Sequence, residues 1–181
     1  MTYRQELKYV VSAAEREMLL LRLRAVMQTD PFALPDGLYT VRTLYFDDAF
    51  HSAVTDTLTG APVREKYRLR MYNMDPSFLR LEKKIKVYGG GLKPEALLTL
   101  PEAEALLRGE HGFLAQKEDP FLLSCYAAAR GGGLKPRAVS QYTRAAFQGT
   151  DGAVRVTVDS NIRVFRFTDA FFNPTLSGAP V

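Results

Sequence analysis

One stretch of the sequence alternates so regularly between charged and apolar residues that it strongly constrains the fold. In residues 63–72, four cationic side chains share one parity: Arg64, Lys66, Arg68 and Arg70. Apolar residues fill most of the other parity, with Glu65 as the exception: Val63, Tyr67, Leu69 and Met71. Residues two apart on a β-strand point to the same face, so the pattern predicts a strand with one cationic and one apolar face.

Residues 79–87 repeat the pattern. The charged parity holds Arg80, Glu82, Lys84 and Lys86, while Lys83 interrupts an otherwise apolar parity. The turn-like segment 73–77 joins the two stretches and predicts a hairpin. Like charges on neighbouring strands destabilise a sheet, so water, carboxylates or a bound polyanion must offset them.

Two interpretations of this face stay open. An antiparallel sheet often has one solvated face, which would explain a single cationic strand. Two adjacent strands of nearly one sign favour an anion site instead. The choice of arginine adds weight, because Arg68 and Arg70 can each bind phosphate oxygens through two hydrogen bonds.

The rest of the chain predicts an α+β fold with an antiparallel sheet in one domain, residues 1–181. Strand-like patterns occupy residues 3–11, 39–46, 135–148, 153–159 and 162–167. Helices are expected from Ser12, which forms a capping box with Glu15, to Met27, and over residues 100–108 and 120–129. Strands dominate and pair locally, which excludes a doubly wound nucleotide-binding fold.

Composition limits the function less than the position of the charges does. The chain has 24 Lys and Arg against 20 Asp and Glu, a surplus too small to identify an anionic partner. Cys125 is the only cysteine, so an intramolecular disulfide is excluded, and its apolar surroundings predict a buried structural thiol. His51 and His111 lack metal-ligand spacing. No signal peptide or membrane-spanning run is found, so the sequence predicts a cytoplasmic protein.

Other predicted strands also carry charge on their polar faces. Glu6 and Lys8 share a face of the first strand, Arg144 lies in the strand 135–148, and Arg155 and Asp159 share a face of the next. If the sheet closes, these faces converge inside it, and the apolar faces lie outside under the helices. Such an interior would suit a long, highly charged ligand.

Six motifs in this order resemble the vacuolar transporter chaperone (VTC) domain, the polyphosphate polymerase branch of the triphosphate tunnel metalloenzymes (CYTH-like superfamily). The motifs are Arg4-Gln5-Glu6-Leu7-Lys8-Tyr9, Thr43-Leu44-Tyr45-Phe46-Asp47, Tyr67-Arg68-Leu69-Arg70, Leu81-Glu82-Lys83-Lys84, Gln141-Tyr142-Thr143-Arg144 and Val154-Arg155-Val156-Thr157-Val158-Asp159. The resemblance implies an antiparallel eight-stranded β-barrel, the triphosphate tunnel. It also implies ATP-dependent polyphosphate synthesis with a divalent metal, Mn²⁺ or Mg²⁺.

The resemblance also implies roles for individual residues. The phosphate-binding residues would be Lys8, Arg68, Arg70, Lys84, Arg144 and Arg155. Lys93 matches a further family lysine, although Pro94-Glu95 replaces the usual second basic residue. Strand parity adds Lys66 and Lys86 to the substrate-binding set.

We expect five of these cations to hold the triphosphate where transfer occurs: Arg68, Arg70, Lys84, Arg144 and Arg155. Glu6, Glu82 and Asp159 would help to bind the metal, since hard divalent ions favour oxygen ligands. The alternative for these three carboxylates is that they pair with neighbouring cations. The chain ends without a match to the family's last strand and its metal-binding glutamate, so we expect the tunnel to lack its last strand or strands.

Three functions remain open from the sequence. They are polyphosphate polymerase, a hydrolase of triphosphate or polyphosphate, and a non-catalytic polyanion-binding module. The expected partners are ATP and polyphosphate or inorganic triphosphate, and a membrane-associated partner is compatible with the absence of a membrane span in the sequence. Nucleic acid is not expected, because the basic strands lack interleaved aromatic residues for base stacking. The oligomeric state stays open.

Overall fold

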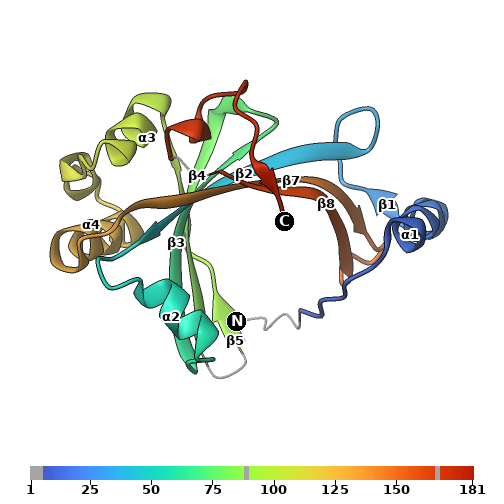
Figure 1. The fold of residues 1–181 in the computed structure, drawn as a ribbon, viewed down its shortest axis with the longest axis horizontal. Helices are drawn as coiled ribbons and strands as arrows, with labels where there is room; N and C mark the ends of the chain where they lie inside the picture. Colours follow the sequence, from blue (N-terminus) through green and yellow to red (C-terminus); the bar gives the residue numbers. More distant parts are fainter. Residues whose placement is uncertain (1–5, 88–89, 166–167) are drawn as a thin grey trace.

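The computed structural model describes residues 6–87, 90–165 and 168–181, and it has an α+β fold built on one antiparallel sheet (Figure 1). The strands are β1 (Gln28–Thr29), β2 (Leu38–Asp47), β3 (Val63–Tyr72), β4 (Asp75–Val87), β5 (Gly90–Leu92), β6 (Glu95–Leu98), β7 (Lys135–Gln148), β8 (Arg155–Phe165) and β9 (Ala179–Pro180). The helices are α1 (Ala13–Val26), α2 (Ser52–Leu58), α3 (Leu100–Leu107) and α4 (Pro120–Gly132), with 3₁₀ turns η1 (Gly112–Gln116) and η2 (Thr168–Phe171).

The sheet curls but does not close. Its strand order is β5-β4-β3-β2-β7-β8-β9, with β1 beside β7 and β6 beside β4. The predicted α+β fold with an antiparallel sheet flanked by helices is confirmed. The described residues form an open sheet of nine strands rather than a closed barrel of eight, in keeping with the expectation that the tunnel is incomplete. The two edges carry the short strands β5 and β9, and these do not pair with each other.

The predicted strand at residues 3–11 is wrong for residues 6–11. Residues 3–5 lie outside the ranges that the structure describes. Residues 6–11 have no regular structure and are exposed. They extend from α1 towards the open side of the curled sheet (Figure 1). Alternating polarity is not enough to make a strand, because a strand also needs a partner for its backbone hydrogen bonds.

The hairpin prediction is confirmed. β3 pairs with β4 in antiparallel register, with Leu69 opposite Leu81 and Lys66 opposite Lys84. The connection uses left-handed backbone at Asn73 and Met74, whose φ angles are 50° and 57°. Consecutive positive φ angles at both central residues are the geometry that matches the twist of a two-residue hairpin.

The last two predicted strands form a single strand, β8. Its pairing with β7 shifts register between Gln141 and Thr143, and Asn161 on β8 has a φ of 52°. Asparagine tolerates this left-handed conformation better than most residues, so the strand can bulge there without ending. The bulge explains why the sequence pattern breaks in the middle of the strand.

The predicted helices are confirmed, with their caps. Ser12 and Glu15 form the expected capping box on α1, and Thr99 and Glu102 form another on α3. The Asp119 side chain accepts hydrogen bonds from the first turn of α4. The sequence interpretation missed α2. This helix has only seven residues, and its N-cap residue makes no capping hydrogen bond, so the sequence shows neither an N-cap residue nor a capping box there.

Most of the apolar core lies on the face of the sheet under the helices, and a small cluster of Tyr39, Val41 and Ala146 is buried on the opposite face. Its largest cluster joins strand residues such as Leu44, Leu69 and Val139 to helix residues such as Leu122. A second cluster packs α1 against β7 and β8. Cys125 is buried as predicted, and burial raises its pKa to about 12, which keeps the thiol protonated. Among the described residues, no helix has the length and hydrophobicity to span a bilayer.

Candidate anion-binding face

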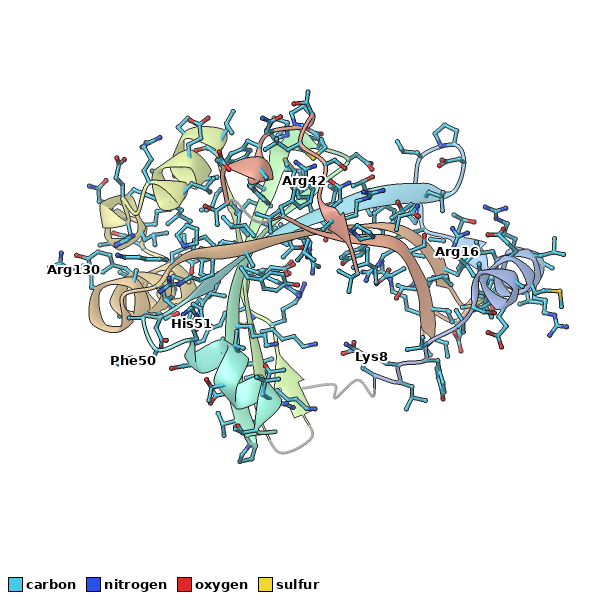
Figure 2. The ribbon with its side chains drawn as sticks, in the orientation of Figure 1. Lys8, Arg16, Arg42, Phe50, His51 and Arg130 are labelled. Carbon is cyan, nitrogen blue, oxygen red and sulfur yellow. The ribbon has the colours of Figure 1, made fainter. Side chains whose placement is uncertain are left out.

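The cationic residues of β3 and β4 lie on the face of the sheet opposite the helices. Since Leu69 and Leu81 belong to the helix-covered core, the alternate residues of the same strands point to the concave side. Figure 2 shows many side chains ending in nitrogen on this side, and it places Lys8 on the facing N-terminal segment. We call this surface the concave face.

Like charges stand opposite one another along the hairpin. Lys66 is the Cα partner of Lys84, Arg64 of Lys86, and Arg70 of Arg80. Only Arg68 faces a carboxylate in this series, that of Glu82. Directly opposed like charges cost stability in a sheet, a cost that a bound anion would offset.

Glu82 lies at the centre of the face, and its side chain is fully buried. Its carboxylate accepts a hydrogen bond from Arg68 Nε at 2.5 Å and lies 3.6 Å from Arg70 Nη1 and 3.2 Å from Lys93 Nζ. Burial alone would raise the pKa of Glu82, but Arg70, Arg68 and Lys93 outweigh it and lower the pKa below its usual value. Glu82 is therefore an ionised counter-charge that fixes the two arginines.

The end of the face around Lys66 has a different balance. Burial lowers the pKa of Lys66, and the nearby charges of Arg64, Lys84, Lys8 and Arg68 lower it further. The neighbouring charges with the largest effect on this pKa are all positive, and Lys66 forms no ion pair with a described carboxylate. This end of the concave face therefore holds more described cations than carboxylates, since the single carboxylate of Glu6 is shared between Lys84 and Lys8.

The far side of the face is organised by two other arginines. Arg144 on β7 binds Asp159 on β8 through two hydrogen bonds of 2.7 Å. Arg155 donates to Asp30 at 2.7 Å and to the Tyr39 hydroxyl at 3.3 Å. Both arginines are held in fixed positions by carboxylates, as Arg68 is.

The remaining predicted residues are placed as follows. Glu6 lies 3.3 Å from Lys84 and 3.4 Å from Lys8, so the N-terminal segment contacts the cationic end. Lys93 also pairs with Glu95 at 2.5 Å. Lys83 points to the opposite face, where it pairs with Glu65 at 2.8 Å.

The three predicted metal ligands do not come together. Glu6, Glu82 and Asp159 each pair with different cations, as the alternative interpretation anticipated. The described ranges contain no group of three His, Cys, Asp or Glu side chains able to hold a metal ion. These residues do not fit a metal held by protein ligands alone.

Sequence reasoning missed two features of β2. Thr43 is the Cα partner of Arg70, and Thr43 Oγ1 and Arg70 Nε are both buried without a hydrogen-bond partner among the described residues. Arg42 is buried on the helix-covered face, where its guanidinium donates to Gln141, Ala170 and Asn173 (Figure 2). The available signal was an arginine at an otherwise apolar position of the strand.

The comparisons with known proteins agree with this architecture. Two solved structures have a TM-score of 0.55 to this chain. One is a candidate adenylate cyclase from Bacillus halodurans, with 16% identity, covering 83% of this chain and 69% of its own. The other is a candidate adenylyl cyclase from Hippeastrum described as having a dominant triphosphatase activity, with 14% identity, covering 82% of this chain and 68% of its own. At these identities the likeness shows the tunnel-type fold.

No curated protein matches the chain. The family model that matches is the VTC domain, and it matches residues 3–178. The match includes the hairpin, the β7–β8 pair and the N-terminal segment that face one another across the concave face. Since it spans nearly the whole sequence, this chain belongs to the VTC domain family.

Proposed function

We propose that this protein transfers the terminal phosphoryl group of ATP to a polyphosphate chain bound on the concave face. One observation carries the proposal: the cations around Lys66 and Lys84 oppose one another and exceed their carboxylate partners. A bound polyanion would neutralise them, and a linear polyphosphate has the repeating charge that matches a row of cations on a strand.

The transfer requires little covalent help from the protein, because positioning and charge neutralisation do most of the work. A terminal oxygen of the polyphosphate forms a new P–O bond to the γ-phosphorus of ATP. The bridging bond between the β- and γ-phosphates breaks, and ADP leaves with that electron pair. Arg68, Arg70, Lys84, Arg144 and Arg155 would neutralise the phosphate oxygens of the two substrates along the concave face.

Carboxylate partners already hold several of these cations in place. Glu82 fixes Arg68, and Asp159 fixes Arg144, so the groups are oriented before the ligand arrives. Preorganised charges of this kind lower the cost of reorganisation during a reaction. Because the described acids do not assemble a metal site, we propose that Mn²⁺ or Mg²⁺ enters as the metal complex of ATP, as part of the substrate.

A hydrolase is the second proposal, supported by the triphosphatase activity described for the Hippeastrum neighbour. The same cations would bind the triphosphate, and water would replace the polyphosphate oxygen as acceptor. The two reactions use the same face and differ in the acceptor alone. In either case the reaction would take place in the cytoplasm, where ATP is supplied.

The test is to supply ATP labelled at the γ-phosphate, with Mn²⁺ or Mg²⁺ and a short polyphosphate primer, and to separate the products on a gel. Labelled long chains would support the polymerase, and labelled orthophosphate alone would support the hydrolase. Neither product, with tight and salt-sensitive tripolyphosphate binding, would support a non-catalytic module and refute both enzymes.

A matched pair of variants controls this assay. Arg144→Met removes a cation of the concave face and should abolish product formation. Lys83→Met removes the same charge from the opposite face, where Lys83 pairs with Glu65, and should leave product formation unchanged.

A further inference from the structure

The concave face changes character along β4, from cationic at one end to aromatic at the other. Beyond Arg70 and Arg80 lie three rings in a row. Tyr39 and Tyr72 have centroids 5.9 Å apart, and Tyr72 and Phe78 have centroids 6.2 Å apart. The aromatic row therefore continues the charged one.

Phe78 is the unusual member of this row. It is 37% exposed, whereas the next residue on the strand, Leu79, is fully buried in the core. Arg80 places its guanidinium carbon 5.0 Å from the centroid of the Phe78 ring. An accessible ring beside a guanidinium is the combination on which nucleic-acid bases stack in proteins that bind them.

The spacing relates this ring to the phosphate-binding cations. Phe78 and Arg80 are two residues apart on β4, which separates them by about 6.7 Å along the strand. Arg80 is the Cα partner of Arg70. A nucleoside has one sugar between its base and its first phosphate, a separation of the same order. A nucleotide with its base at Phe78 would therefore place its first phosphate near Arg70 and Arg80.

We propose that Phe78, with Tyr72 and Arg80, forms the stacking site for the purine base of ATP. The triphosphate then runs along the hairpin from Arg70 towards Lys66 and Lys84. The inference rests on the proposed function and deepens it, because it gives the substrate a direction: nucleoside at the β3–β4 turn, polyphosphate at the opposite end. Stacking tolerates any base, so the site should accept GTP nearly as well as ATP.

The chain contains no tryptophan, which gives a direct test. Phe78→Trp places a single indole at the proposed site. ATP should quench or shift its emission, and tripolyphosphate at saturating concentration should not. Phe50→Trp is the control, because Phe50 is 86% exposed and lies beside α2, away from the concave face (Figure 2).

A second variant measures the contribution to affinity. Phe78→Leu should weaken ATP binding about tenfold, within the range observed for the loss of one base-stacking contact. Tripolyphosphate affinity should change less than twofold. Equal losses for both ligands, or no loss for ATP and no emission change in Phe78→Trp, would overturn the base site.

The proposed function fails in a different way. If the unmodified protein binds neither tripolyphosphate nor ATP, the concave face is not an anion site, and the base site fails with it. If it binds tripolyphosphate but Phe78 has no effect on ATP, the anion site stands and the base site alone is refuted.

Discussion

Replacing Glu82 by glutamine should destabilise the protein while making it more responsive to phosphate ligands. The Glu82 side chain is fully buried, and the side chains of its partners Arg68 and Arg70 are only 15% and 11% exposed. Removing one member of a buried ion pair costs about 3–5 kcal/mol, since the remaining charge is left unpaired. Glutamine keeps an oxygen that can accept from Arg68, so we expect about 3 kcal/mol, the lower end of that range.

Urea denaturation measures this loss in the free energy of unfolding. In thermal denaturation of a chain of 181 residues, a loss of ~3 kcal/mol corresponds to a fall in Tm of about 6–12 °C. Glu65→Gln is the comparison on the other face, where Glu65 is 44% exposed and its partner Lys83 is 13% exposed and also lies over the Tyr67 ring. Because solvent screens the partly exposed Glu65 carboxylate and Tyr67 still contacts Lys83, this variant should lose less stability than Glu82→Gln.

The effect of tripolyphosphate on the Tm tests whether Arg68 and Arg70 belong to an anion site. In Glu82→Gln the phosphate oxygens would replace the lost carboxylate charge, so saturating metal-free tripolyphosphate should raise the Tm of the variant more than that of the unmodified protein. Equal or smaller stabilisation of the variant would refute the reasoning, because it would mean that the ligand does not reach Arg68 and Arg70.

The Glu82 carboxylate also fixes the sign of a pH effect. Its pKa is lowered in the folded protein from an ordinary value of 4.5, because the nearby cations outweigh burial. The stability it supplies is therefore present above pH 4.5 and is lost as pH falls through the lowered pKa. The stability difference between the unmodified protein and Glu82→Gln should shrink over that acidic range.

Three more predictions follow from single side chains. Lys66→Met should weaken tripolyphosphate binding about tenfold, and Lys83→Met should weaken it less than twofold, as measured by titration calorimetry. Equal losses in the two variants would contradict the assignment of these lysines to opposite faces of the sheet. Because burial and neighbouring cations lower the pKa of Lys66 below its ordinary 10.5, tripolyphosphate affinity should fall as pH rises through that lowered pKa; a Lys66→Met variant with an unchanged profile would contradict this. Arg42→Met should lower the free energy of unfolding by about 3 kcal/mol, because the carbonyls of Ala170 and Asn173 lose a charged hydrogen-bond donor. The loosened segment should expose Phe171 to chymotrypsin, and unchanged cleavage would show that Arg42 does not hold this segment on the sheet.

The sequence predicts those parts of the fold that depend on local patterns. The β3–β4 hairpin follows from a period of two residues, and α1 follows from the Ser12–Glu15 capping box, because both signals act within a few residues. The same reasoning failed at residues 6–11, where the alternation is present but none of the described strands pairs with the segment. Whether a segment becomes a strand depends on a distant partner, which its own residues do not specify.

The candidate site shows the same limit. Strand parity placed Arg68, Arg70 and Glu82 on one face, but it could not show that Glu82 lies directly opposite Arg68, since that depends on the register set by the turn at Asn73 and Met74. Parity also could not reveal the aromatic row, because Tyr39 reaches Tyr72 from a different strand.

The opposed lysines of the hairpin have a practical consequence for work with the purified protein. Lys66 and Lys84 repel each other in the native fold, and an unfolded chain would release that repulsion. Multivalent buffer anions that bind between them in the folded protein should therefore stabilise it against unfolding, because a ligand that binds only the native state shifts the equilibrium towards it. Thermal midpoints measured in phosphate or sulfate should exceed those in chloride at equal ionic strength, and the choice of buffer will determine the apparent stability of the protein.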